Sequence, residues 1–136
     1  MRGIVGLALA TAALAACATG SAGMSQATML TVTYWESGPR GSDPERWTLR
    51  CNPADGTLPR PALACRRLAS ASPKLFAPKP PSLVCTQIYG GPQTARVTGK
   101  VKGKRVWASF SRTNGCEISR WNRLSPWLLP SGGVTR

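Results

Sequence analysis

Alternating apolar and polar residues predict strands in two early segments of the chain, 28–36 and 46–51. Both segments are rich in β-branched and aromatic residues. The side chains that share an apolar face are Leu30, Val32 and Tyr34 in the first segment and Trp47, Leu49 and Cys51 in the second. Glycine, proline and aspartate residues in 37–45 predict a turn region between the two strands.

A β-hairpin is the clearest local pattern in the second half of the chain. Residues 96–101 and 104–111 alternate on either side of a turn at Lys102-Gly103. The apolar face of the two arms consists of Val97, Val101, Val106, Ala108 and Phe110. Most basic side chains of the arms fall on the opposite face, and Trp107 lies on that side, where we expect it to be exposed.

The remaining segments predict a helix, a final strand and two irregular regions. Residues 62–70 form a candidate short helix that starts just after a proline, and 116–121 form a candidate last strand. Four prolines in 72–82 exclude a regular element there, and the tail, 125–136, is expected to be frayed. Strands dominate, so the chain predicts an α+β domain with an antiparallel sheet and helices on one side.

The first 16 residues, MRGIVGLALATAALAA, have the form of an export signal. Arg2 gives a short positive start, and the apolar run that follows is too short to span a hydrocarbon core about 30 Å thick. The run ends in LAAC, which resembles a bacterial lipobox, so we expect Cys17 to carry a lipid and 17–27 to tether the domain to the outer face of the cytoplasmic membrane. The alternative is an ordinary secretory signal that is cut close to the same place.

Five cysteines are an odd number for a protein exported into an oxidising space. Lipidation of Cys17 would leave four, and four cysteines allow three pairings. The four are Cys51, Cys65, Cys85 and Cys116. Sequential pairing closes the shortest loops. A zinc site is the competing interpretation, but the spacing contains no CxxC pair.

Length, charge and composition restrict the function. The chain has 136 residues, enough for one domain, and a formal net charge of +13 from 18 basic and 5 acidic residues. It has no histidine, which excludes Ser-His-Asp and Cys-His catalytic arrangements and His-ligated metal sites. Five scattered carboxylates leave little for acid–base chemistry. We therefore expect a small secreted binding module with no catalytic activity, no metal site and no cofactor.

The excess of basic residues predicts attraction to polyanions, most strongly at 100–105. Trp107 beside this patch is a candidate for stacking on nucleic-acid bases. Export and disulfides place the domain outside the cell, so no nucleic-acid partner is expected. Anionic lipid headgroups or wall polymers fit a tethered protein better. A solvated face that aids solubility is the simplest interpretation.

Five short motifs follow one another along the chain. They are LTVTYWE at 30–36, LRCNP at 49–53 with prolines before Ala64-Cys65, CTQIY at 85–89, GKRV at 103–106 and NGCE at 114–117. Together with the order and spacing of the four cysteines, these motifs resemble the subtilisin inhibitor-like family. The resemblance covers about residues 28–120.

The resemblance implies a five-stranded antiparallel sheet with two short helices packed on one side, in a domain at 28–124. It implies the disulfides Cys51–Cys65 and Cys85–Cys116, and a homodimer associated through the sheet. Its functional implication is substrate-like inhibition of subtilisin-like serine proteases. The alternative is a non-inhibitory cell-surface module that uses a basic sheet face to bind anionic polymers.

The family motif also implies which residues meet the protease. The scissile bond falls between Gln87 and Ile88, and the implied contact residues are Val84, Cys85, Thr86, Gln87, Ile88 and Tyr89. Asn114 matches a position whose side chain supports the loop through hydrogen bonds to loop carbonyls. The chain departs from the family at Thr86, where proline is common, and at Gln87, where Met or Lys is frequent. Tyr89 is also a candidate core residue.

Overall fold

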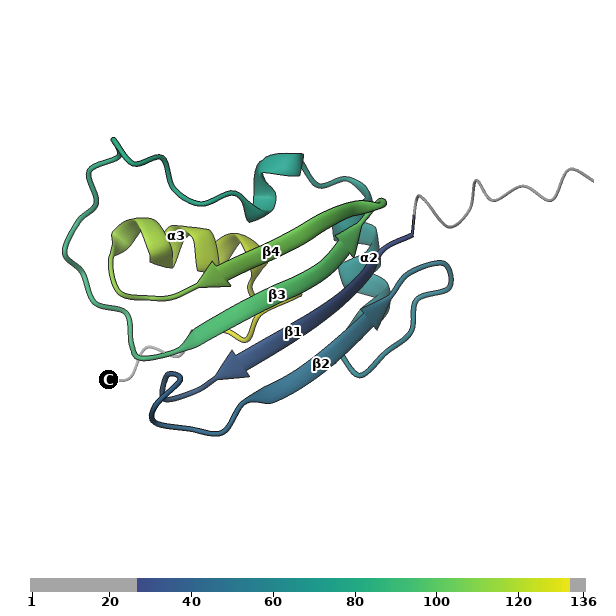
Figure 1. Cartoon of the computed structure of the whole chain (residues 1–136), viewed down its shortest axis with the longest axis horizontal. Coiled ribbons are helices and arrows are strands. Elements are labelled where there is room, and N and C mark those ends of the chain that lie inside the picture. The colour runs from purple at the N-terminus through teal and green to yellow at the C-terminus, as the bar shows by residue number, and fades with distance from the viewer. Residues whose placement is uncertain (1–26, 133–136) are drawn as a thin grey trace, which may run out of the picture.

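The computed structural model describes residues 27–132 of the chain (Figure 1). The predicted signal peptide, 1–16, and Cys17 lie outside the described residues, as does all of the predicted tether except Ala27. Among residues 27–132, no helix has the length and apolar character needed to cross a membrane.

Four antiparallel strands form one sheet, in the order β2-β1-β3-β4. The strands are β1 (Met29–Trp35), β2 (Glu45–Arg50), β3 (Thr94–Val101) and β4 (Lys104–Phe110). The prediction of five strands is wrong for the described residues, because the segment predicted as the last strand is helical.

The predicted hairpin between β3 and β4 is confirmed, with Val101 paired to Lys104 across the turn. Lys102 and Gly103 have φ angles of 49° and 78°. Two central residues with positive φ define a turn whose twist matches that of the flanking strands. Glycine adopts this conformation without steric cost, so Lys102-Gly103 fixes the register of the hairpin.

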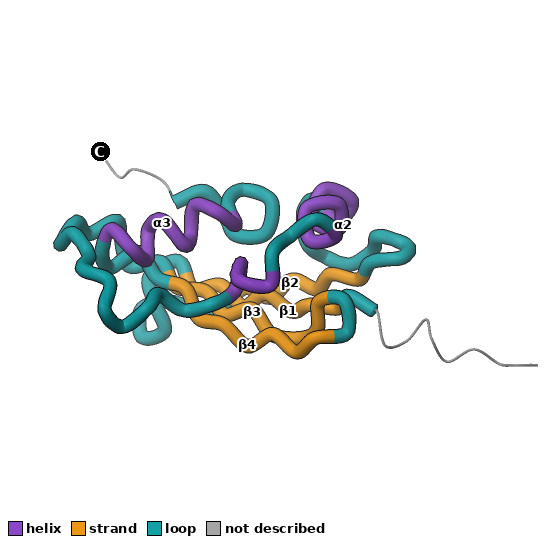
Figure 2. The backbone as a smooth tube through the Cα atoms, turned by 90° about the horizontal axis from the view of Figure 1, so that it is seen from above, coloured by secondary structure: helices purple, strands orange, loops and turns teal. Residues whose placement is uncertain are grey.

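Two α-helices and one 3₁₀ turn lie on one side of the sheet, and within residues 27–132 no helix lies on the other side (Figure 2). Helix α2 (Pro61–Ala69) begins with proline in its first turn, as the sequence predicts. The turn η1 (Pro73–Phe76) corrects the expectation that 72–82 contains no regular element. The Ser72 hydroxyl accepts a hydrogen bond from the Lys74 N–H at its start. Proline is tolerated at the first position because its missing N–H would have no partner within the turn.

Helix α3 (Gly115–Leu124) replaces the predicted strand at 116–121. The Asn114 side chain accepts a hydrogen bond from the Glu117 N–H, 3.0 Å away, and so caps the first turn. Trp121 and Leu124, three residues apart, bury themselves on the same side of the helix. Asn followed by Glu at the third position is a helix-start signal that outweighs the weak alternation of this segment.

The core lies between the sheet and the helices. Its largest fully buried side chains are Trp121, Phe110, Leu49, Leu68, Leu124, Leu128, Leu129, Val32 and Val97. The segment after α3 therefore differs from the predicted frayed tail, because Trp127, Leu128 and Leu129 complete the core. Its backbone is irregular, as the nearby prolines predict, but an irregular backbone does not prevent burial of an apolar run.

Candidate functional site

A long loop without regular secondary structure connects η1 to β3 and passes around the end of α3 (Figure 1). Residues 82–91 of this segment, which we call the braced loop, contain all six residues that the sequence implies as protease contacts. These six residues are consecutive, and the structure places five of them as exposed residues, with Cys85 half-buried.

The braced loop exposes apolar side chains that proteins usually bury. Of the six large hydrophobic residues that are exposed within 27–132, four belong to it. Their exposed fractions are 49% for Leu83, 93% for Val84, 61% for Ile88 and 65% for Tyr89. The interpretation of Tyr89 as a core residue is therefore wrong. Clustered exposed apolar side chains indicate a surface that binds another molecule.

Two bonds to the start of α3 hold the loop at Cys85 and Thr86. The disulfide Cys85–Cys116 joins Cα atoms 5.3 Å apart, and the Gly115 N–H donates to the Thr86 carbonyl at 3.0 Å. A Cβ atom on Gly115 would collide with the Thr86 side chain. Glycine at this position therefore lets the helix approach the loop backbone closely.

Arg112 holds the loop on the other side of Gln87, at Gly90. The Gly90 N–H donates to the Arg112 carbonyl at 2.7 Å, and the Arg112 Nε donates back to the Gly90 carbonyl at 3.2 Å. These anchors bracket Gln87, Ile88 and Tyr89. The three exposed residues are thus fixed at both ends by contacts to the body of the domain.

The Arg112 side chain also connects the loop to the core. It is buried, and its guanidinium lies 6.0 Å from the ring centre of Trp121. Burial raises the pKa of Tyr34, nearby carboxylates raise it further, and the Arg112 charge lowers it. Arg112 therefore lies where the loop, α3 and the inner face of β1 meet.

Residues 78–84 lead into the braced loop and include its first three residues, and this segment is held at its start. Arg120 of α3 donates from Nε to the Ala77 carbonyl at 3.1 Å and forms an ion pair with Glu117 at 2.7 Å. A hollow of about 650 Å³ lies between this segment and α3. Val84, which is almost fully exposed, is among the residues that line this hollow.

The side-chain hydrogen bond that the structure gives Asn114 is the cap of α3 described above. The bond between this turn and a loop carbonyl comes from the neighbouring Gly115 N–H. Asn114 thus fixes the start of the helix that carries Gly115 and Cys116, the two residues that are bonded to the loop.

Sequence reasoning missed Arg112, Gly115 and Arg120 as supporting residues. The two arginines resemble the other surface cations of a basic chain, and nothing in their neighbours indicates burial. Gly115 carried a signal, because NGCE places a glycine beside a cysteine that is tied to the loop. Within residues 27–132, no three His, Cys, Asp or Glu side chains are grouped where they could hold a metal ion.

The fold and the site define a small disulfide-bonded α+β domain that displays one exposed loop fastened on both sides. Comparison with known families assigns it further: residues 24–114 match the family described as subtilisin inhibitor-like. The chain belongs to this family. The pairing Cys51–Cys65 and Cys85–Cys116, which the resemblance implied, is confirmed.

Two known proteins illustrate the relationship. Trypsin inhibitor STI2 from Streptomyces longisporus is 38% identical over 116 residues, which is 84% of this chain and 76% of that protein. The crystal structure of Streptomyces caespitosus sermetstatin in complex with Bacillus licheniformis subtilisin contains a chain that is 30% identical. That comparison covers 69% of this chain and 90% of the other, with a TM-score of 0.47.

Proposed function

We propose that this protein inhibits subtilisin-like serine endopeptidases by presenting the braced loop in the manner of a substrate. The observation that carries the proposal is the bracing itself. An exposed apolar segment is fixed on one side by Cys85–Cys116 and on the other by Arg112. Such a segment loses little conformational entropy when it enters a protease cleft, so binding is tight.

The reactive bond in this proposal is the one between Gln87 and Ile88. Anchors at Thr86 and Gly90 lie close to the bond on its two sides. If a protease cuts it, both new ends stay attached to the domain and remain in the cleft. Religation then competes with release, and the protease stays occupied.

The exposed side chains fit distinct roles in the protease cleft. Gln87 would enter the primary specificity pocket, and Val84 would fill a neighbouring apolar pocket. Ile88 and Tyr89 would contact the leaving-group side. The extended backbone would add hydrogen bonds to the edges of the cleft, which is the usual mode of strand addition.

The uncharged Gln87 favours a subtilisin-like target over a trypsin-like one. Trypsin carries an aspartate at the bottom of its specificity pocket and selects cations there. The relative from Streptomyces longisporus is named a trypsin inhibitor, so the family includes members named for that specificity. We propose that the present chain differs from it in target.

The direct test is a titration of subtilisin activity with the purified domain, residues 24–136, followed by mass spectrometry. We expect stoichiometric loss of activity and, after long incubation, one clipped bond between Gln87 and Ile88. No inhibition at micromolar concentration would reject the proposed function. Inhibition with a clip elsewhere would reject only the assigned bond.

Changing Gln87 to lysine should redirect the inhibitor toward trypsin. We expect Gln87→Lys to strengthen trypsin inhibition by about thirtyfold or more, because a buried anchor residue contributes about 2 kcal/mol or more. Inhibition constants for both proteases measure the change. Asn122→Lys, which adds the same charge on an exposed position of α3, is the matched control and should leave both constants unchanged. If both variants had the same inhibition constants for the two proteases, Gln87 would not be the residue that enters the specificity pocket.

Two disulfides are typical of exported proteins, which supports an extracellular site of action. We propose that Cys17 anchors the inhibitor by a lipid on the outer face of the membrane. Mass spectrometry of the protein purified from membranes tests this, and an unmodified mature protein found only in the medium would reject the anchor.

A further inference from the structure

The turn between β3 and β4 lies at the end of the sheet where the chain enters the domain. The Gly103 N–H donates to the Ala27 carbonyl at 3.0 Å, and the Lys102 N–H donates to the Thr28 hydroxyl oxygen at 3.0 Å. Helix α2 lies at this end too (Figures 1 and 2). We call the turn, 101–104, together with α2 the entry end of the domain.

The braced loop lies at the opposite end of the sheet (Figure 1). Strand β3 begins at Thr94, shortly after the braced loop, and ends at Val101, beside the turn. Its eight residues span about 24 Å, because an antiparallel strand rises about 3.4 Å per residue. The length of the sheet therefore separates the braced loop from the entry end.

The five acidic residues are divided unevenly between these two ends. Glu36 and Asp43 lie between β1 and β2, at the end that carries the braced loop, and Glu45 begins β2 there. Glu117 lies in the first turn of α3, whose start is bonded to the braced loop. Only Asp55 lies near the entry end, where it bridges to the last residue of β2.

The entry end carries cations that no nearby acid neutralises. Two of them, Lys102 and Lys104, belong to the turn, and two more, Arg66 and Arg67, belong to the last turn of α2. All four are exposed. The one ion pair within residues 27–132 lies in α3, so the positive charge of the entry end is open to solvent.

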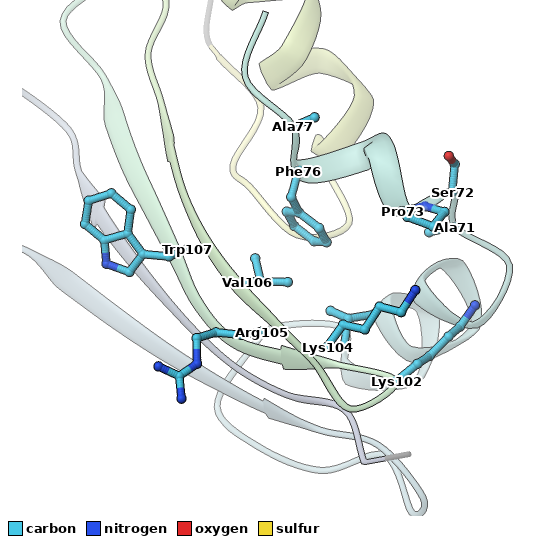
Figure 3. A pocket seen from close by; sticks show the side chains of 11 residues that line it. Ala71, Ser72, Pro73, Phe76, Ala77, Lys102, Lys104, Arg105, Val106 and Trp107 are labelled. Atoms are coloured by element: carbon cyan, nitrogen blue, oxygen red, sulfur yellow. The ribbon is translucent and has the colours of Figure 1, made fainter. Parts of the chain in front are cut away.

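A pocket of about 390 Å³ lies beside the two lysines, and its apolar wall includes Phe76 of η1 and Val106 of β4. Both apolar side chains are half-buried. Figure 3 shows Lys102 and Lys104 on the same side of the hairpin as Val106, whereas Trp107 points to the other side. Binding to a membrane surface gains from buried apolar area as well as from charge attraction. Lysines beside an apolar pocket therefore favour a membrane over a soluble polyanion.

We propose that the entry end binds the surface of a membrane that contains anionic phospholipids, so that the braced loop faces away from the bilayer. Charge complementarity supports this partner. The entry of the chain supports it separately, on the basis of the proposed lipid anchor: Ala27 is ten positions after Cys17, and an extended chain of that length reaches about 36 Å at most. The sheet face that points away from the helices takes no part, so the homodimer that the resemblance implies through it can form at the same time.

Sedimentation of the purified domain, residues 24–136, with lipid vesicles tests the docking. This domain lacks Cys17, so its binding cannot come from a lipid anchor. We expect it to bind vesicles of phosphatidylglycerol and phosphatidylcholine in equal parts, less tightly as salt increases, and not to bind vesicles of phosphatidylcholine alone. Lys102→Gln/Lys104→Gln should weaken binding about twenty-five-fold, because each cation near an anionic surface contributes about fivefold.

The matched control is Arg40→Gln/Arg123→Gln, which removes the same charge from exposed positions outside the entry end and should change binding little. Arg66→Gln/Arg67→Gln on α2 should weaken binding as the lysine pair does, and circular dichroism checks that every variant is folded. Equal weakening by the control would show an effect of net charge alone and overturn the proposal. So would absence of binding to the anionic vesicles, or binding to soluble poly(glycerol phosphate) that is as tight as binding to the vesicles.

Subtilisin inhibition on vesicles tests the orientation, and this step rests on the proposed function. The vesicle-bound domain should inhibit as strongly as the free domain, because the braced loop faces the solution. Inhibition by the free domain that is lost on vesicles would overturn the orientation. A domain that inhibits in neither state would reject the proposed function, whereas sedimentation would still decide whether the entry end binds the membrane.

Discussion

The domain has two irregular loops tied by disulfides, and they place their apolar side chains in opposite directions. The loop 52–60, between Cys51 and Cys65, turns Leu58 inward until it is 3% exposed. Its backbone returns to β2 through the Leu58 N–H, which donates to the Thr48 carbonyl at 3.0 Å. The braced loop turns Val84 and its apolar neighbours outward instead.

The two disulfides therefore serve different purposes. Cys51 and Cys65 pack against the core, so their bridge holds an element that is already stabilised by burial. The Cys85–Cys116 bridge holds a segment that buries little and gains nothing from the core. Rigidity in such a segment has no evident use for the fold alone, and this contrast supports the proposal that the braced loop is the binding element.

Removing each disulfide in turn is expected to have the largest effect on the difference between the two loops. We expect Cys85→Ser/Cys116→Ser to convert the inhibitor into a substrate that subtilisin digests, because the residues before the Gln87–Ile88 bond are then held only by the hydrogen bond from Gly115 to Thr86. Cys51→Ser/Cys65→Ser should retain inhibition at a temperature where it remains folded. Residual protease activity over time, with electrophoresis of the products, measures both.

Thermal or urea unfolding supplies the control for that experiment. In the chain-entropy model each bridge stabilises by about 3 kcal/mol, slightly more for the longer separation of 31 residues than for 14. If the two double variants lose similar amounts of stability, their difference in inhibition must come from the position of the bridge that each one lacks. If both variants inhibited equally well after long incubation, the bracing argument would fail.

The sheet was largely predictable from the sequence, because its signals are local. Alternation located β1, β2 and the hairpin within one or two residues, and Lys102-Gly103 fixed the turn. The position of the loop could also be inferred, from the cysteines and the family motif. Its exposure could not, because the same apolar residues would be equally compatible with burial.

The failures of prediction concern residues whose role depends on distant partners. Arg112 supports the loop only because the fold brings Gly90 and Trp121 to it. Helix α3 carries a local start signal at Asn114, but the alternation of its residues predicts a strand. The buried tail shows the same limit, since its prolines predict irregularity and say nothing about where the intervening Trp127 packs.

Replacing Arg112 by methionine should weaken inhibition, but less than removal of the Cys85–Cys116 disulfide does. Arg112→Met retains the aliphatic packing but removes the bond from Nε to the Gly90 carbonyl. Loss of a charge-assisted hydrogen bond of about 1.5 kcal/mol predicts inhibition weakened about tenfold. The rate at which subtilisin hydrolyses the loop should rise, which separates loosened bracing from weaker contact. Arg67→Met removes the same charge from α2 and should change neither value, so an equal effect in both variants would contradict the role of Arg112.

The smallest effect is expected at the glycine that lets α3 approach the loop. Gly115→Ala places a methyl group against the Thr86 side chain, which must rotate or move the loop outward. Mild overpacking of about 1 kcal/mol predicts inhibition weakened about fivefold, with little change in unfolding. Gly56→Ala is the counterpart in the other loop, where φ is +120° and the new methyl would meet the Thr48 backbone. That variant should lower stability and spare inhibition of the folded protein. Adding Thr86→Ala to Gly115→Ala removes the colliding group, so inhibition should recover to the level of Thr86→Ala alone; if it does not, the close approach of helix and loop is not what positions the reactive bond.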